Sequence, residues 1–275
     1  MAINTELVGK SYTIPEFTYN HRDAMIYALA IGADETDLEF VYEKHGPKVY
    51  PSFATVASGL GGSDIIEDLA INPMMIIHGE QRVRIHGALP PSATVTTVGT
   101  VAGIYDKGAN ALVDLEFKSS VDGELLFENV VSMIVRGDGG FGGERSPKRE
   151  KSQAPDRAPD RQVKVQTEGR QALVYRLSGD WNPLHADPDI AKASGFERPI
   201  LHGLCTFGCT ARAIVRELCD NDPEAIRSMA VRFSSPVLPG ELLTVELWTE
   251  GKTVFVRTKN EADAVVLSNG VFELA

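Results

Sequence analysis

The sequence predicts an α+β protein made of two similar repeats, in each of which an antiparallel sheet wraps around a helix. Three observations lead to this prediction. Residues 21–32 align without gaps to residues 169–180, about 148 residues further along the chain, a spacing that suits a duplicated domain and is too long for a solenoid. Each stretch is followed by runs rich in β-branched residues, which are typical of strands. A segment rich in glycine, proline and charged residues, 137–162, separates the two halves.

The first repeat is expected to span residues 1–136 and to open with a short helix. Met25, Ile26 and Leu29 recur at helical spacing, and Asn20 is a candidate N-cap. Three β-rich runs follow and are predicted to form strands of an antiparallel sheet: 94–104, 111–117 and 125–135.

The long helix that should fill the sheet of the first repeat is interrupted. Gly59, Gly61 and Gly62 fall within four residues, and each interior glycine costs a helix about 1 kcal/mol relative to alanine. We therefore expect this N-terminal central helix to be shortened or lost. A repeat without its full helix leaves a groove, although simple decay of a duplicated copy would produce the same sequence.

Residues 137–162 are predicted to form a surface linker. The segment begins with seven residues of which five are glycine, and from Glu144 to Gln162 it has, proline aside, no apolar side chain larger than alanine. Such a stretch cannot bury enough surface to offset the entropy of ordering it.

The second repeat, residues 163–275, follows the same order. Leu173, Val174 and Leu177 indicate a short opening helix, for which Thr167 is a candidate N-cap. A continuous helical run follows at 203–218, with small or apolar side chains at helical spacing: Cys205, Cys209, Ala213 and Ile214. Strands are predicted at 242–248, 253–257 and 265–274.

The composition excludes several classes of protein. With 43% hydrophobic and 24% charged residues, the 275-residue chain is typical of a soluble globular protein. Its net charge of −11 argues against nucleic-acid or anionic-membrane binding, but leaves room for a small basic pocket. No apolar run approaches the roughly 18–20 residues of a membrane span, and neither a secretory signal nor a peroxisomal Ser-Lys-Leu address is visible. We therefore expect a cytoplasmic protein.

The three cysteines are expected to be reduced packing residues. Cys205, Cys209 and Cys219 lie close together without Cys-x-x-Cys spacing, and Cys205 and Cys209 share one helical face. No set of His and Cys residues shows the spacing of metal ligands, so no metal site is expected.

The stretch from Tyr175 to His185 carries the clearest chemical signal. It places Asp180 and His185 five residues apart, across a turn favoured by Gly179 and Pro183. A carboxylate and an imidazole brought together in this way can act on one water molecule. The alternative is that Gly179 ends a helix, Asp180 forms a turn and His185 is a surface residue.

The residues that follow this stretch decide between these interpretations. Ala186-Asp187-Pro188 and the run from Gly195 to Gly208, together with residues 175–185, resemble the hydratase 2 signature of the MaoC-like (R)-specific enoyl-CoA hydratases. The resemblance covers nearly the whole chain and is closest to the hydratase 2 unit of peroxisomal multifunctional enzyme type 2. It extends to further motifs: His78-Gly79-Glu80-Gln81, Leu89-Pro90-Pro91, Asp106-Lys107-Gly108 and Gly139-Gly140-Phe141-Gly142-Gly143. This family implies a double hot-dog fold, which agrees with the pattern of repeats.

The resemblance also implies a reaction, the reversible syn hydration of a trans-2-enoyl-CoA to a (3R)-3-hydroxyacyl-CoA. Asp180 and His185 would be the acid/base pair, Asn182 would hold the water or orient Asp180, and Gly203 would offer a backbone N–H to the thioester oxygen. His202 is expected to support the site from behind. The positions implied to bind substrate are His78, Gly79, Lys107, Trp181, Pro183, Leu184 and Phe233. No cofactor is implied, since CoA is part of the substrate.

Three other functions remain open at this stage. Hot-dog proteins also include acyl-CoA thioesterases, and the same dehydration chemistry occurs on acyl carrier protein. A non-catalytic acyl-thioester-binding module is the third alternative, although the intact signature argues against it. The groove in the first repeat is expected to accommodate the acyl chain, whose length and branching the sequence does not define. A homodimer is expected from the family.

The first repeat is expected to be non-catalytic. Opposite Asp180 it has Gly32, or Ala33 if the glycines are matched instead, and no Asn-Pro-x-His follows the nearby Asp34. One polypeptide should therefore carry one active site.

Overall fold

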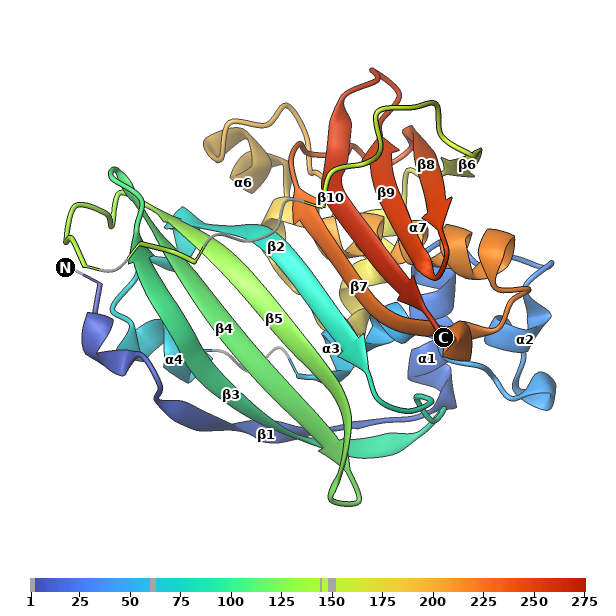
Figure 1. The fold of residues 1–275 in the computed structure, drawn as a ribbon, viewed down its shortest axis with the longest axis horizontal. Helices are drawn as coiled ribbons and strands as arrows, with labels where there is room; N and C mark the ends of the chain where they lie inside the picture. The colour runs from blue at the N-terminus through green and yellow to red at the C-terminus, as the bar shows by residue number, and fades with distance from the viewer. Residues whose placement is uncertain (1–2, 60–62, 144, 148–151) are drawn as a thin grey trace.

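The computed structural model describes residues 3–59, 63–143, 145–147 and 152–275. It is a double hot-dog in which ten antiparallel strands form one continuous sheet, ordered β1-β3-β4-β5-β2-β7-β10-β9-β8-β6. The first half supplies β1 Ser11–Tyr19, β2 Ile76–Ile85, β3 Ala93–Asp106, β4 Asn110–Val121 and β5 Glu124–Arg136. The second half supplies β6 Arg161–Gln166, β7 Ile226–Phe233, β8 Leu242–Glu250, β9 Thr253–Lys259 and β10 Val265–Leu274. Figure 1 shows both halves facing the viewer, with helices behind them.

The strand order shows the internal repeat directly. Read outward from its centre, the order is β2-β5-β4-β3-β1 on one side and β7-β10-β9-β8-β6 on the other. The two halves meet where β2 pairs with β7, in a register that runs from Glu80 opposite Arg232 to Arg84 opposite Ser228. Each predicted strand run lies within an observed strand or matches its bounds.

Helix α7 Gly203–Leu218 is the centre of the second half, as predicted. Every residue from Cys205 to Val215 is buried, because the sheet covers one side of the helix and other helices cover the rest. The three cysteines are reduced and buried, which confirms their packing role. The other helices are short: α1 His21–Ala30, α2 Leu38–Val41, α3 Ala54–Ala57, α4 Ser63–Asp68, α5 Gln171–Tyr175 and α6 Pro188–Ala193.

The counterpart of α7 in the first half is truncated, as the glycines predicted. Helix α3 has 4 residues against 16 in α7, and the chain leaves it at Gly59, whose φ of +74° favours glycine. The carbonyl of Ala54 accepts a hydrogen bond from Asn129 Nδ2 on β5 at 2.9 Å. Leu60, Gly61 and Gly62, where the groove was expected, lie outside the described residues, so the acyl-chain groove stays a prediction.

One of the two predicted N-caps is right and the other is wrong. Asn20 caps α1 in a full capping box with Asp23. Thr167 does not cap α5, which starts four residues later, after Arg170. The Thr167 hydroxyl instead donates to the carbonyl of Glu241 at 2.7 Å and accepts from the Gly240 N–H, so it ties the end of β6 to the loop before β8.

The boundaries expected for the two repeats and the linker remain predictions. Strand β5 ends at Arg136, where the first repeat was expected to end. Strand β6 starts at Arg161, at the end of the expected linker. No helix among the described residues is long and apolar enough to cross a membrane.

A buried ion pair connects the two halves. Arg212, in the middle of α7, donates from Nη2 and Nε to Asp37 Oδ2 at 2.5 and 3.1 Å. Arg212 is 5% exposed and Asp37 is 1% exposed. Burial alone would lower the pKa of Arg212, but the hydrogen bond and charge of Asp37 outweigh it, and the pKa is raised.

Removing Asp37 should destabilise the fold strongly, because the buried Arg212 would keep only the more distant carboxylate of Asp34, at 3.6 Å. We expect Asp37→Ala to lower the free energy of unfolding by about 3 kcal/mol or more, measured by urea denaturation. The matched control is Arg170→Ala, which breaks the exposed Arg170–Glu168 pair and should cost no more than about 1 kcal/mol. Equal effects of the two substitutions would contradict this account.

Candidate functional site

The loop that carries Asp180 is shaped by its own residues. The 3-10 helix η5 Arg176–Ser178 ends at Gly179, whose φ of +117° suits glycine. Asp180 Oδ1 then accepts the backbone N–H of Asn182 at 3.2 Å. The side chain of Asn182 accepts the N–H of Leu184 at 3.0 Å and so caps the 3-10 helix η6 Pro183–His185. These local bonds set the distance between Asp180 and His185.

His185 has the protonation state that a general base needs. Its Nδ1 lies 2.9 Å from the backbone carbonyl of Ile200. A carbonyl can only accept, so Nδ1 carries the proton and Nε2 keeps a free lone pair. Burial lowers the pKa of His185 below its ordinary value, against the opposing effects of the Ile200 bond and the Asp180 charge. The imidazole is therefore neutral at pH 7.

His202 is the structural neighbour of both residues. Its ring stacks on that of His185 with centroids 3.7 Å apart and planes 28° apart, and its Nε2 lies 3.3 Å from the backbone oxygen of Asp180. His202 is 1% exposed. Burial, with the nearby imidazole of His185, lowers the pKa of His202 to about 4. The role of His202 as a residue that supports the site from behind stays a prediction.

Asp180, His185 and His202 each bring one possible ligand atom within 4.8 Å of the other two. Imidazole lone pairs lie in the plane of the ring. Because the two rings are stacked and nearly parallel, their lone pairs do not converge on one ion as metal coordination requires. The cluster therefore fits proton transfer better than metal binding. The sequence predicts His202 near the site but not the stacking of its ring on His185, because His202 reaches the cluster from the start of another helix.

Gly203 has a backbone N–H outside the hydrogen bonds of α7 and no side chain that would crowd Phe233. It is the first residue of α7, so its N–H cannot be used by the helix's own hydrogen bonds and lies at the positive end of the helix dipole. A Cβ at this position would come within 3.1 Å of the Phe233 ring. Any other residue would therefore displace Phe233 or the start of α7.

The first half contributes one wall of the site. His78 on β2 packs edge-on against Phe233 on β7, with ring centroids 4.8 Å apart. Burial lowers the pKa of His78 to about 4, although the charge of Asp180 acts in the opposite direction. The neighbouring Gly79 lets the backbone of β5 approach closely, since a Cβ on residue 79 would lie 3.2 Å from the Ser132 carbonyl oxygen. The site thus lies between the two halves.

The remaining predicted substrate positions lie further out. Trp181 is 57% exposed, with the Arg176 guanidinium 4.7 Å from its ring centroid. Pro183 is exposed and Leu184 half-buried on η6. Lys107, in the turn between β3 and β4, donates to Ser146 Oγ. Lys107 and Gly79 line one open groove of about 940 Å³, so the structure brings these two together but places Lys107 outside the Asp180–His185 cluster.

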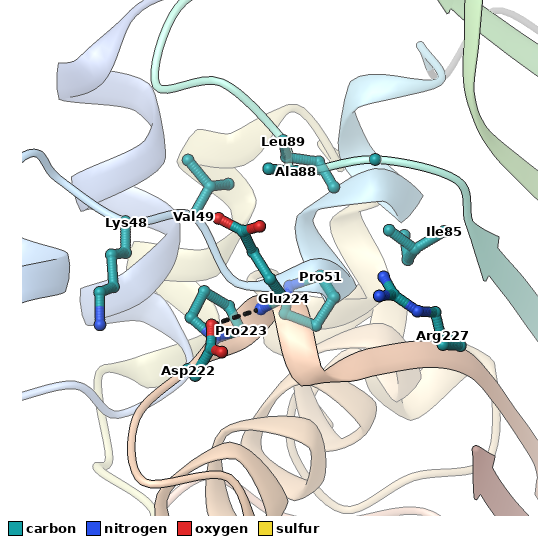
Figure 2. Close-up of a pocket in the computed structure, with 11 residues that line it drawn as sticks. Lys48, Val49, Pro51, Ile85, Ala88, Leu89, Asp222, Pro223, Glu224 and Arg227 are labelled. Atoms are coloured by element: carbon teal, nitrogen blue, oxygen red, sulfur yellow. Dashed lines mark hydrogen bonds between the residues drawn. The ribbon is translucent and has the colours of Figure 1, made fainter. Parts of the chain in front are cut away.

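Residues 32–37 of the first half, which align with residues 180–185, do not repeat the Asp180–His185 pair. In the gap-free alignment, Asp37 takes the place of His185, and its carboxylate is occupied by Arg212. Ile85, which aligns with Phe233, lines a small pocket of about 90 Å³. Figure 2 shows the Glu224 carboxylate directed toward Val49 and Ala88 in this pocket. Its lining contains no histidine: Lys48, Val49, Pro51, Ile85, Gly87, Ala88, Leu89, Asp222, Pro223, Glu224 and Arg227.

Comparison with known families gives one match in each half of the chain. A family model described as a MaoC-like domain matches residues 150–270. A second, described as the MFE-2 hydratase 2 N-terminal domain, matches residues 17–137. The two matches thus separate the half that holds Asp180 and His185 from the half that lacks them.

Individual proteins are similar over almost the full length. The peroxisomal enoyl-CoA hydratase 2 of Arabidopsis thaliana is 40% identical, with 95% of this chain and 93% of that protein covered. The 3-hydroxyacyl-thioester dehydratase Y of Mycobacterium tuberculosis is also 40% identical, with 99% of each covered. A crystal structure of a MaoC-like dehydratase from Phytophthora capsici superposes with a TM-score of 0.89 at 33% identity, covering 99% of this chain and 98% of that one. A more distant M. tuberculosis structure, 14% identical with a TM-score of 0.62 over 97% of this chain and 96% of that one, is described as a double hotdog and shows the fold alone.

The buried neutral histidines predict a specific dependence of stability on pH. Below its ordinary pKa of 6.5, His78 takes up a proton in the unfolded chain but not in the folded one until pH falls to about 4. The free energy of unfolding should therefore fall between pH 6.5 and 4. Between pH 7 and pH 5, the free energy of unfolding of His78→Asn should fall by about 2 kcal/mol less than that of the wild type. Urea denaturation at both pH values measures this difference. Parallel losses in the two proteins would contradict the neutral, buried His78.

Proposed function

The chain belongs to the MaoC-like hydratase 2 family, and from this membership we propose that it catalyses the reversible hydration of trans-2-enoyl-CoA to (3R)-3-hydroxyacyl-CoA. The observation that best supports the proposal is the neutral His185, with its Nε2 free, beside Asp180 and the N-terminus of α7. This arrangement combines a proton acceptor, a carboxylate and a backbone donor within one partly buried site.

In the proposed reaction, Asp180 and His185 act on one water molecule. One of the pair accepts a proton from the water as its oxygen bonds to C3 of the substrate, and a proton is delivered to C2 from the pair. Both groups lie in one cluster, so oxygen and hydrogen add to the same face of the double bond. Asn182 orients Asp180 through its backbone N–H, while its side chain caps η6.

Gly203 is proposed to stabilise the charge that develops on the thioester oxygen. Attack at C3 moves electrons through C2 to that oxygen, which becomes an enolate. The N–H of Gly203 and the positive end of α7 are already in place before this charge forms, which is the condition for effective stabilisation. A larger residue here would crowd the Phe233 ring, since a Cβ at this position would lie 3.1 Å from it.

His78 and Phe233 are proposed to flank the reacting part of the substrate, with Trp181, Pro183 and Leu184 near the opening. The acyl chain is proposed to extend toward the truncated helix α3 of the first half. A cytoplasmic location and a homodimer also remain proposals.

The direct test of the proposed reaction is to follow the loss of enoyl absorbance with crotonyl-CoA and decenoyl-CoA, and to determine the stereochemistry of the product. Release of free thiol from a saturated acyl-CoA would instead favour a thioesterase.

Loss of either acid/base group should abolish most of the activity. We expect Asp180→Ala and His185→Ala each to lower kcat with crotonyl-CoA by on the order of 10²-fold or more. The matched control is Asp189→Asn, since Asp189 is an exposed carboxylate in the first turn of α6, near the same loop. If either alanine variant were as active as this control while remaining folded by circular dichroism, that residue would have no catalytic role.

The ion pair between Asp37 and Arg212 in the first half predicts how many substrate analogues one chain binds. Because Asp37 is held by Arg212 where the second half has His185, one polypeptide should bind one equivalent of a tight-binding product analogue. Isothermal titration calorimetry measures this ratio directly. Two equivalents per chain would show that the first half has an active site of its own.

A further inference from the structure

Four buried polar atoms between the two halves have no hydrogen-bond partner within the part of the chain that the structure describes. They are the hydroxyls of Tyr27, Ser52 and Tyr175 and the Nδ1 atom of His202, called here the inner polar cluster. Each of these side chains is at most 1% exposed. Buried polar atoms are nearly always hydrogen-bonded, because an unbonded one costs free energy. The inner polar cluster therefore indicates a bound molecule that supplies these bonds.

The members of the inner polar cluster lie together around Tyr175. Tyr27 and Tyr175 hold equivalent positions in the two repeats, and their ring centroids are 6.0 Å apart. On its other side, Tyr175 contacts His202, with centroids 4.9 Å apart. Burial raises the pKa of both tyrosines, and the hydroxyl of Thr55 is near enough to oppose this effect in each. Ser52 opposes it in Tyr27 as well.

The neighbouring side chains do not complete the bonding of the cluster. The hydroxyl of Thr55 already donates to the carbonyl of Ser52 at 2.8 Å. The hydroxyl of Tyr27 lies against α7 at Gly208, where a Cβ would come within 3.0 Å of it. An interior glycine costs a helix about 1 kcal/mol relative to alanine. Helix α7 thus has a glycine at the point where it makes room for this hydroxyl, which phenylalanine would not need.

His202 requires a hydrogen-bond donor at Nδ1. Its Nε2 lies 3.3 Å from the backbone oxygen of Asp180, and since a carbonyl can only accept, Nε2 carries the proton. The pKa of His202 is lowered to about 4, mainly by burial, so the ring is neutral at pH 7. Nδ1 then keeps a buried lone pair, which only a donor can satisfy.

We infer that buried water molecules bind in the inner polar cluster, where they bridge the hydroxyls of Tyr27, Ser52 and Tyr175 and donate to Nδ1 of His202. Internal waters typically make about three hydrogen bonds to groups that are otherwise unpaired. An ion is a poor ligand here, because hydroxyls and a neutral imidazole have no charge to compensate for its burial.

The bound water also has a positioning role, and this part of the inference rests on the proposed function. With Nδ1 of His202 accepting from water, the proton of this ring stays on Nε2 and faces the backbone of Asp180. The water thereby holds in place the residue whose carboxylate acts in the reaction.

The first test is the sign of the stability change when one hydroxyl is removed. Tyr27→Phe and Tyr175→Phe each lose a bond to water, so the equilibrium constant for unfolding should rise about fivefold, measured by urea denaturation. The matched reference is Tyr19→Phe, since Tyr19 is 2% exposed and its hydroxyl donates to the Pro90 carbonyl at 2.7 Å. If the hydroxyls of Tyr27 and Tyr175 are unbonded, their removal should lower the constant instead, which would overturn the inference.

A crystal structure at a resolution that shows ordered water tests the same inference directly. Water should lie within about 3 Å of a tyrosine hydroxyl of the cluster and of His202 Nδ1. Direct hydrogen bonds among the four side chains, with no water between them, would overturn the inference even if both phenylalanine variants are destabilised.

Kinetics with crotonyl-CoA test the positioning role. We expect Tyr175→Phe to lower kcat about tenfold and to keep KM within twofold of the wild type, because a displaced Asp180 affects the reaction more than binding. Tyr19→Phe, with a similar loss of stability, should keep the kcat of the wild type. Equal kcat in the two variants would overturn the positioning role. A wild type that does not hydrate crotonyl-CoA would refute the proposed function, while urea denaturation and crystallography would still decide whether water binds.

Discussion

The pairing of β2 with β7 is the interaction on which the rest of the structure depends. This ladder joins two half-sheets into one surface and brings His78, from the first half, against Phe233 and toward Asp180 in the second. Because side chains alternate across a strand, successive residues of β2 and β7 face opposite sides of the sheet. The inner face forms a wall of the site that holds Asp180 and His185, and the outer face presents Arg82 and Arg232 to the groove of about 940 Å³ that Gly79 and Lys107 also line. A shift of one residue in this register would exchange the two sets.

The two halves have diverged in complementary ways around this shared sheet. The second half keeps the full central helix, which begins at Gly203. The first half has lost most of its helix, and Asn129 now satisfies a carbonyl of the remaining turn. Arg212 extends from the intact helix into the region where a second catalytic histidine would lie, and binds Asp37 there. The second half thus holds Asp180 and His185 beside an intact central helix, and the first half contributes His78 to the same site.

Burial controls the chemistry of the site more than charge does. His78, His185 and His202 all have lowered pKa values, and in each case the main cause is the loss of solvent around the imidazole. The carboxylate of Asp180 opposes this effect but does not overcome it. The result is a site in which the imidazoles are neutral at pH 7 and His185 can accept a proton.

The sequence by itself determined the local features, because these depend on near neighbours in the chain. The chain leaves helix α3 at Gly59, Asn20 caps α1, and the Asp180–His185 turn forms from its own side chains. The family signature added the site residues and the double hot-dog. The error at Thr167 arose because its partners, Gly240 and Glu241, lie more than seventy positions away. Only the tertiary structure decided that His202 stacks on His185, that Arg212 binds Asp37, and that Arg82 and Arg232 share a groove. Each of these contacts joins distant segments, and their positions are set by sheet pairing and core packing, which no local pattern records.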